Sequence, residues 1–494
     1  MNLLLTNIPK DRLWLFIALT IFNLCAIFNN GYYHPDEHYQ IVEFAEYKTG
    51  RNAANDLAWE YQAKIRPSIQ CAIFFLMVNI FRFFHIVDPY DIMTIVRMLT
   101  ATFSVLVIFN FINVTKSLLN QKLRGLYILL SYFLWFLPFL GARFSSENIS
   151  GLFFLLALGK TLKAKSDYNY FIIGLLLGFS FLFRFQTALL SIGLLLWLCL
   201  IKKSNFSKIS MLILATLLTV NIGAIIDYWF YDSFSYSFIN YFIVNILQDK
   251  ASSFGTSPWY YYLIEVSRFG VLPISIMIFA AFFVVMAYDR RNFMVWIMLP
   301  FILIHSLIPH KELRFLFPLA NLIPFLILSA MGILKEQINL SSVGLTTFRL
   351  FGILYFIVNT AALLIVMISP ADDEGRVTIT EFIHNKYMGK RVSLWYINSA
   401  NPYKPIAPPQ KFYKDGNVYP SRFDITNKRL LYKENHINLM VIQTRDKLSN
   451  PDFFSANPTK LIMYGIPKWV QSFRTFFHYG EPNKAYELLE IVRP

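Results

Sequence analysis

Two short polar segments of this chain hold the residues best suited to chemistry. The first, the acidic segment, reads His34-Pro35-Asp36-Glu37-His38-Tyr39-Gln40. Pro35 fits the first turn of a helix, where the helix dipole also favours acidic side chains. Taken alone, the segment is typical of an ordinary helix start. Its carboxylates are also candidates for a general base, because a carboxylate can accept the proton of a hydroxyl group.

The second, the cationic segment, reads Pro309-His310-Lys311-Glu312-Leu313-Arg314-Phe315 and lies between two apolar runs. Charged residues at a span end normally anchor it at the membrane interface. Here the cations fall on the side of the membrane where few are expected, and Glu312 lies among them. Lysine offers a phosphate a point charge and arginine offers it a bidentate fork. The segment therefore predicts a phosphate site.

Placed on one face of a membrane, the two segments suggest one reaction. A carboxylate would deprotonate a hydroxyl group, and the cations would stabilise a departing phosphate, as in glycosyl transfer from a lipid phosphate. A single base suffices for an inverting displacement, whereas a retaining mechanism uses two carboxylates. No metal is required, since Lys, Arg and His can meet the phosphate charge. A divalent cation still has candidate oxygen ligands in Asp36, Glu37 and Glu147.

Further polar residues lie at predicted outer span ends. Arg184 interrupts a long apolar stretch, and charge inside a membrane usually faces a cavity. For Arg66, Arg143 and Arg184 the simpler interpretation is snorkelling or helix capping. Trp259 opens an apolar run with Tyr260, Tyr261 and Tyr262, which suits an aromatic belt as well as sugar stacking.

Composition indicates the setting in which these residues act. The chain has 494 residues, of which 56% are hydrophobic and 15% are charged, whereas soluble domains have about 25% charged residues. It is therefore expected to be an integral membrane protein. The net charge of +15 does not indicate nucleic acid, because Lys and Arg lie mainly in short linkers that set membrane orientation. The three cysteines lie in apolar runs without paired spacing, which supports neither disulfides nor a metal site.

The apolar runs predict an all-α polytopic fold with about 11 transmembrane helices, because roughly 20 apolar residues cross a bilayer as helix. The first run, 13–28, has no cleavage pattern and is expected to be a retained span. The positive-inside rule puts 29–66, 143–148, 227–258, 309–314 and everything after Pro370 outside. With the loops assigned to these faces, the apolar stretch 69–84 has no crossing to make. It is therefore expected to lie along the membrane interface or to dip into it. The other predicted spans are 94–114, 125–141, 147–163, 168–183, 186–201, 207–226, 259–287, 292–308, 314–333 and 347–368.

Two domains are expected. Residues 1–370 form the transmembrane catalytic domain, whose outer loop 29–68 carries the acidic segment. From Ala371 the sequence becomes rich in Pro, Asn, Lys and Tyr, with alternating runs such as Arg391–Tyr396 and Leu439–Gln443. Residues 371–494 are therefore predicted to be a small extracytoplasmic α/β domain.

The acidic and cationic segments together resemble glycosyltransferase family 22, the polyprenyl-phosphate-mannose-dependent mannosyltransferases. Between them, Asp227–Tyr231, Asn240, Asn245 and Gly255–Tyr262 resemble the central loop of the branch that adds the third mannose to GPI anchors. The resemblance covers roughly residues 10 to 335. Ser257 and Tyr260–Tyr261 depart from the usual His and His-Trp of that loop, so the acceptor stays open.

The resemblance implies a GT-C fold, an active site on the lumenal or periplasmic face, and a lipid-linked mannose donor. It implies that Asp36 is the base and that Glu37 orients either this base or the acceptor. The donor phosphate would be bound by His310, Lys311, Arg314, Arg184 and Arg66. Other substrate contacts would come from His34, Gln40, Arg143, Asn245, Trp259 and Glu312, the last holding the cations in place. The partners would be a glycan or glycolipid acceptor and the bilayer, in a bacterial inner membrane or, alternatively, the endoplasmic reticulum.

Two other classes of protein compete with this prediction. A transporter or flippase of lipid-linked glycans also needs many spans, but it predicts inverted repeats and broken helices, and no convincing repeat is present. A scaffold protein would leave the acidic and cationic segments far apart.

Overall fold

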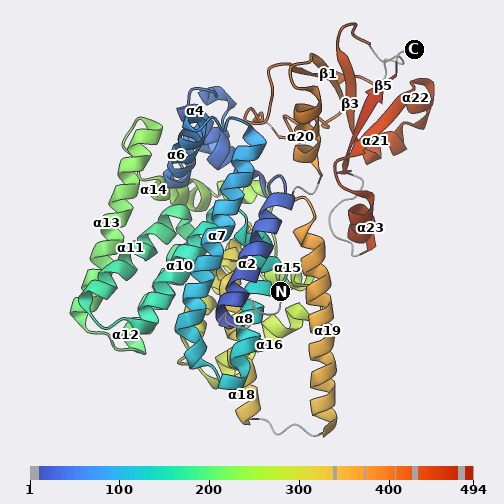
Figure 1. Cartoon of the computed structure of the whole chain (residues 1–494). Helices are drawn as coiled ribbons and strands as arrows, with labels where there is room; N and C mark the ends of the chain where they lie inside the picture. Colours follow the sequence, from blue (N-terminus) through green and yellow to red (C-terminus); the bar gives the residue numbers. More distant parts are fainter. Residues whose placement is uncertain are drawn as a thin grey trace. The chain divides into compact units, whose positions relative to one another are not determined.

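Figure 1 shows the computed structural model of the chain, which describes residues 10–337, 342–371, 374–406, 408–425, 432–476 and 484–492. The chain forms two compact units. The first unit comprises Met1–Ala26, Ala63–Ala72 and Arg97–Met367, and the second comprises Ile27–Gln62, Ile73–Val96 and Ile368–Pro494. The acidic segment therefore folds with the C-terminal part of the chain, and the cationic segment belongs to the helical first unit.

The first unit is built almost entirely of helices. The helices that lie wholly or mainly in it are α2 (Lys10–Phe28), α7 (Pro89–Thr115), α8 (Arg124–Phe133), α9 (Phe136–Gly141), α10 (Ser146–Lys163), α11 (Asp167–Phe183), α12 (Ala188–Leu200), α13 (Phe206–Tyr231), α14 (Ser237–Phe242), α15 (Tyr261–Gly270), α16 (Ile274–Tyr288), α17 (Phe293–Leu307), α18 (Ile323–Gln337) and α19 (Ser342–Met367). Short 3-10 or π turns connect several of them, including η5 (Phe185–Thr187), η6 (Ile243–Leu247) and η8 (Leu313–Leu322).

Among the described residues, 5 helices are long and apolar enough to cross a membrane, and several shorter apolar helices accompany them. This pattern confirms an integral membrane protein. The total number of spans predicted from the sequence, about 11, stays a prediction. So does the interfacial position of 69–84, which forms the helix α6 (Ile69–Phe83).

Two runs predicted as single spans are broken, which corrects the sequence reading. The run 125–141 divides into α8 and α9, where Asn359 Nδ2 donates to the Phe133 carbonyl and Asn359 Oδ1 accepts from the Trp135 amide. A buried amide thus satisfies the backbone groups that the break releases, as membrane helices require. The run 259–287 divides into α15 and α16 just before Pro273, a residue that cannot donate to a continuing helix.

Helices α11 and α13 lie side by side in Figure 1 and approach closely through small residues. A Cβ added to Gly174 would lie 2.2 Å from the carbonyl oxygen of Leu212, and one added to Gly178 would meet Thr219 at 2.5 Å. Only glycine permits this spacing, which is the usual way in which membrane helices gain packing contact.

The C-terminal part of the second unit contains a five-stranded sheet in the order β2-β1-β3-β5-β4. The strands are β1 (Val392–Ile397), β2 (Val418–Phe423), β3 (Ile437–Gln443), β4 (Thr459–Tyr464) and β5 (Tyr486–Ile491). Strands β1, β2 and β3 are parallel, and β5 runs antiparallel to both β3 and β4. The small α/β fold predicted from the two alternating runs is confirmed, since they form β1 and β3.

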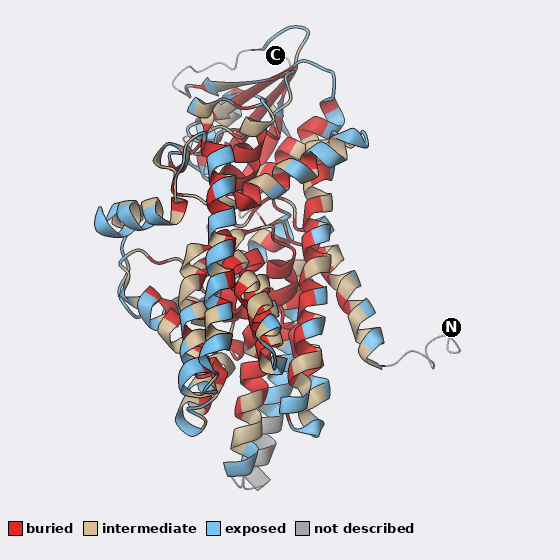
Figure 2. Cartoon of the chain, turned by 90° about the vertical axis from the view of Figure 1, so that its left-hand side faces the viewer, coloured by how far each residue is buried: buried red, intermediate tan, exposed pale blue. Residues whose placement is uncertain are grey.

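Alternation along the strands gives this sheet two apolar faces. Leu394 and Leu439 pack on one face with Ile379 and Ile383 of α20 (Arg376–Tyr387). The neighbouring Trp395 and Met440, among others, form the core of the opposite face. Burial is accordingly concentrated in the three central strands, β1, β3 and β5, and strands of this sheet are coloured red in Figure 2.

The N-terminal part of the second unit consists mainly of short helices. They are α3 (Pro35–Glu37), the π-helical turn η1 (His38–Val42), α4 (Glu43–Lys48), η2 (Ala54–Asp56), most of α5 (Glu60–Ala63) and most of α6. The acidic segment thus begins a helix whose second turn is π-helical, a distortion that is frequent at functional sites.

Candidate active site

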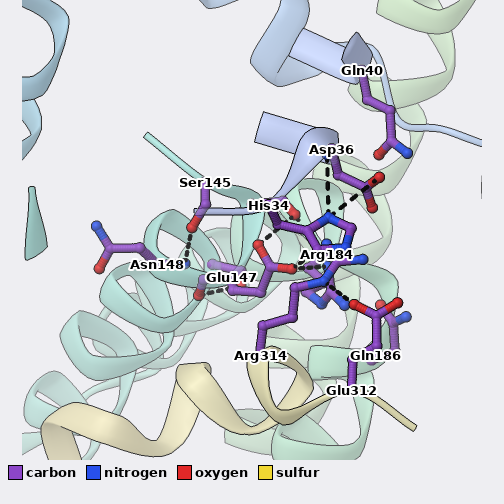
Figure 3. Close-up of polar contacts among 12 residues, drawn as sticks. His34, Asp36, Gln40, Ser145, Glu147, Asn148, Arg184, Gln186, Glu312 and Arg314 are labelled. Atoms are coloured by element: carbon purple, nitrogen blue, oxygen red, sulfur yellow. Dashed lines mark hydrogen bonds and ion pairs between the residues drawn. The ribbon is translucent and has the colours of Figure 1, made fainter. Parts of the chain in front are cut away.

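A buried carboxylate in the first unit bridges two arginines that are distant in sequence. Glu147 Oε1 accepts from Arg184 Nη1 at 2.8 Å and from Arg314 Nη1 at 2.9 Å (Figure 3). The three side chains are only 3%, 4% and 8% exposed, respectively. One carboxylate oxygen thus bridges two guanidinium groups, and Arg314 has a second carboxylate partner in Glu312.

Backbone geometry brings these side chains together. Ser145 caps α10 by accepting from the Asn148 amide at 3.2 Å, which places Glu147 in the first turn of the helix. One turn further on, a Cβ added to Gly151 would lie 2.9 Å from the Cα of Pro318 in η8, so that α10 and η8 are in close contact. Arg314 lies four residues before Pro318 and reaches Glu147 along this contact.

Arg184 reaches the cluster from a break between two helices. It ends α11 in an extended conformation, and η5 begins directly after it. Its guanidinium also lies 5.1 Å from the ring centroid of Phe315, and that of Arg314 lies 5.4 Å from the same ring. The ring thus gives both cations a cation–π contact.

Glu312 joins the remaining parts of the cationic segment. Its Oε2 accepts from Arg314 Nε, and its Oε1 lies 3.0 Å from His310 Nε2. The other ring nitrogen of His310 lies 2.9 Å from the carbonyl oxygen of Gly255. The hydrogen bond to Glu312 is the main cause that raises the pKa of His310. Two acceptors on the two nitrogens suit the imidazolium form, which donates from both.

Lys311 is placed differently from what the sequence suggested. Its Nζ donates to the carbonyls of Ile308 at 2.6 Å, Ser257 at 2.8 Å and Pro309 at 3.4 Å. An ammonium group has three donors, and the three carbonyls match that number. The bond to the Ser257 carbonyl fastens the central loop to the cationic segment. Burial lowers its pKa.

Arg66 is connected to the turn that carries Arg184. The Arg66 guanidinium lies 5.9 Å from the ring centroid of Tyr241, and the hydroxyl of Tyr241 accepts from Gln186 Nε2 at 2.6 Å. Arg143 is also buried, with its guanidinium 5.5 Å from the ring of Phe139.

The two central-loop candidates lie in the first unit, where Asn245 is half-buried and Trp259 is exposed. Asn245, in η6, lines an apolar cavity of about 250 Å³ together with Ile308 and Pro309. Trp259 is 67% exposed, and its ring centroid lies 5.7 Å from that of Tyr260. An exposed indole of this kind can serve either as an interfacial anchor or as a sugar platform.

In the second unit, Asp36 begins the helix that the acidic segment predicts. His34 is the N-cap, and its Nδ1 accepts from the Asp36 amide at 3.2 Å (Figure 3). An accepting Nδ1 carries no proton, so its 3.6 Å approach to Asp36 Oδ1 is not a hydrogen bond. The Asp36 side chain is 21% exposed, and it can therefore meet a substrate.

Neighbouring residues of the acidic segment are engaged within the second unit. Gln40 Nε2 donates to Glu60 Oε1 at 2.9 Å, and Glu37 is partly exposed beside Asp36. His38 is buried, and its Nε2 lies 2.8 Å from Glu43 Oε1.

Sequence reasoning gave two of these residues too small a part. The sequence presents Glu147 as a possible oxygen ligand and as part of the polar stretch 143–148 at an outer span end, but it does not indicate the pairing of Glu147 with the two arginines. No pattern in the sequence pointed to Glu43. Among the described residues, no group of three or more His, Cys, Asp or Glu is arranged to hold a metal ion.

Comparison with known proteins now adds to this geometry. Residues 14–382 match the model of the Alg9-like mannosyltransferase family. The chain is 26% identical to GPI mannosyltransferase 3 of Candida albicans, over 67% of this chain and 66% of that protein. It is 28% identical to the probable Dol-P-Man:Man(7)GlcNAc(2)-PP-Dol alpha-1,6-mannosyltransferase of Schizosaccharomyces pombe, over 43% of this chain and 38% of that protein. The chain thus spans less than two thirds of the length of either relative.

A solved structure shares the fold. The crystal structure of ArnT from Cupriavidus metallidurans bound to undecaprenyl phosphate superposes with a TM-score of 0.53 and 10% sequence identity, over 97% of both chains. This likeness confirms the predicted class of fold, a helical membrane part with a small C-terminal sheet.

Proposed function

Because the chain belongs to the Alg9-like mannosyltransferase family, we propose that it is an enzyme that transfers mannose from a polyprenyl-phosphate-mannose donor to a hydroxyl group of a glycan or glycolipid. The names of the two relatives described above support the transferred sugar. They give no support to a transporter or flippase of lipid-linked glycans.

The observation that carries this proposal is the buried Arg184–Glu147–Arg314 cluster. Burying charges is costly unless they are paired, and here two guanidiniums share one carboxylate oxygen. Glu147 and Glu312 hold the two guanidiniums, and together with protonated His310 these guanidiniums suit the phosphate of a lipid donor. Arginine forks bind phosphate oxygens in pairs, and a preorganised cation stabilises the negative charge that develops as the phosphate departs.

In the proposed reaction, Asp36 takes the proton of the acceptor hydroxyl. The hydroxyl oxygen then attacks the anomeric carbon of mannose, and the bond to the donor phosphate breaks with inversion. Arg184, Arg314 and protonated His310 receive the phosphate, with Arg66 behind them. Glu37 orients the base or the acceptor.

The remaining polar residues have supporting roles in this proposal. Glu147 and Glu312 hold the cations in position, and Lys311 fastens the central loop. His34 caps the helix that presents Asp36. Arg143, Gln40, Asn245 and Trp259 are proposed to contact the sugar or the acceptor.

The proposed setting is the extracytoplasmic face of a membrane. A bacterial inner membrane with a periplasmic site is favoured by the Lys, Asn, Ile and Phe usage of the chain, and the acceptor there would be an envelope glycan or glycolipid. The lumenal face of the endoplasmic reticulum is the alternative.

The proposal is tested by incubating purified full-length protein with labelled undecaprenyl- or dolichyl-phosphate mannose and extracted membrane glycolipids. Label should move into the glycolipid fraction. Arg314→Gln should weaken donor binding roughly 10–100-fold, because a hydrogen bond to a charged group contributes about 1.5–3 kcal/mol. Arg268→Gln removes an exposed arginine of α15 and should leave donor binding unchanged. Equal donor affinity in both variants would refute the phosphate site.

A further inference from the structure

The acidic segment is held by a segment that comes from the C-terminal half of the chain, within the same compact unit. The contact centres on Glu43, whose side chain is 1% exposed. Glu43 Oε1 accepts from His38 Nε2 at 2.8 Å and from the Phe412 amide at 3.1 Å, and Glu43 Oε2 accepts from Asn52 Nδ2 at 2.8 Å. A buried carboxylate thus ties the turn after Asp36 to the segment that contains Phe412.

Aromatic rings make the same connection. The His38 ring is stacked between Tyr32, with centroids 5.4 Å apart and planes at 23°, and Tyr413, at 5.2 Å and 14°. Gln410 Nε2 donates to the hydroxyl of Tyr32. The imidazole is therefore packed against two nearly parallel rings, one of them that of Tyr413.

The column of rings continues beyond Tyr413. Tyr413 stacks on Tyr90 at 4.9 Å and 25°, and the ring of Tyr90 lies 5.3 Å from that of His384. His384 lies between two carboxylates, Asp415 at 2.8 Å and Asp88 at 2.9 Å. Ring pairs at these distances have favourable stacking geometry, so the column joins the acidic segment to α20.

From these contacts we infer that His38, Glu43 and Tyr413 are positioning residues for Asp36. Asp36 lies two residues before His38, at the point where the helix passes into the π-helical turn. A residue so near to a buried, fully packed side chain keeps a fixed backbone position while its own side chain stays open to substrate. The C-terminal part of the chain then positions the proposed base, because residues 410–415 complete the packing around the acidic segment.

The test uses full-length protein in detergent micelles and two readouts. Hydrogen exchange of the amides of residues 36–48 reports the order of the segment without any assumption about the reaction. Transfer kinetics with undecaprenyl-phosphate mannose rest on the proposed function. Tyr413→Ala should speed exchange in 36–48 and lower kcat about 10–100-fold at unchanged donor KM, because a misplacement of about 1 Å can cost about 100-fold in rate.

Two further variants make the result specific. Tyr413→Phe keeps the stacked ring and should restore both readouts. Tyr486→Ala removes a ring that is equally buried, from the core of the C-terminal sheet, and should leave exchange in 36–48 unchanged. If Tyr413→Ala does not fold, Glu43→Gln, which keeps the side-chain shape and loses the charge, should speed exchange in the same residues.

The outcomes separate the two proposals. A folded Tyr413→Ala or Glu43→Gln with wild-type exchange in 36–48 would overturn the positioning role, and so would an equal effect of Tyr486→Ala. If exchange changes as expected but the wild-type protein transfers no mannose, the positioning role stands and the proposed function fails.

Discussion

Replacing Glu147 with glutamine should destabilise the protein far more than the same substitution in a solvent-exposed ion pair. Glu147 is 3% exposed and compensates both Arg184 and Arg314. Removing one partner of a buried ion pair costs about 3–5 kcal/mol, because the other charge stays buried without compensation. Glutamine keeps one acceptor oxygen, and Arg314 keeps its contact with Glu312, so the expected loss lies near the lower end, about 3 kcal/mol.

The matched control is Glu265→Gln. Glu265 pairs with Arg268 at 2.7 Å, but these side chains are 24% and 72% exposed. Such surface pairs contribute about 0–1 kcal/mol. The two substitutions remove the same charge from pairs of similar length, so burial is the main difference between them.

Thermal unfolding in detergent micelles measures both variants. The midpoint should fall clearly for Glu147→Gln and little for Glu265→Gln. Undecaprenyl phosphate should raise the midpoint of Glu147→Gln more than that of the wild type, because its phosphate supplies the missing negative charge and a ligand stabilises the state that binds it. Equal midpoint shifts in the two variants, or no additional rescue by the lipid phosphate, would refute this reasoning.

Two further predictions concern pH. The hydrogen bond that His310 donates to Glu312 raises the pKa of His310, so the cation persists above the usual value near 6.5. Binding of undecaprenyl phosphate should therefore weaken as pH rises through the raised pKa. His310→Gln should flatten this profile, and an unchanged profile would count against a phosphate contact. Burial lowers the pKa of His384, but Asp415 and Asp88 outweigh it and the net shift is upward. The stabilisation that protonated His384 gives the folded protein should therefore be complete below about pH 6.5 and be lost as pH rises through the folded-state pKa. Thermal unfolding midpoints of the wild type and of His384→Gln across this pH range would check this. The midpoint of the variant should depend less on pH than that of the wild type.

Much of the helical architecture could be read from the sequence, because length and hydropathy decide which runs are helical in a membrane protein. The breaks could not. The interruption between α8 and α9 depends on Asn359, which is more than 200 positions away in the chain and reaches the released backbone groups only in the folded protein. Similarly, alternation predicted β1 and β3, whereas the pairing order of the sheet depends on contacts that a sequence pattern does not encode.

The candidate site shows the same division. Residue types identified the cationic segment, but its organisation depends on Glu147, which the close approach of Gly151 to Pro318 brings to Arg314. For Lys311 the residue type alone suggests phosphate binding. In the structure its ammonium group donates hydrogen bonds to backbone carbonyls, which no sequence pattern indicates.

The proposed role of Asp36 as the base of the transfer reaction can be measured by single-turnover transfer from bound undecaprenyl-phosphate mannose in Asp36→Asn. The control is Asp91→Asn, at an exposed aspartate of α7. Asp36→Asn should fold and bind the donor as the wild type does but transfer mannose about 10²–10⁴-fold more slowly, while Asp91→Asn should be unaffected. Wild-type transfer by a folded, donor-bound Asp36→Asn would contradict this role.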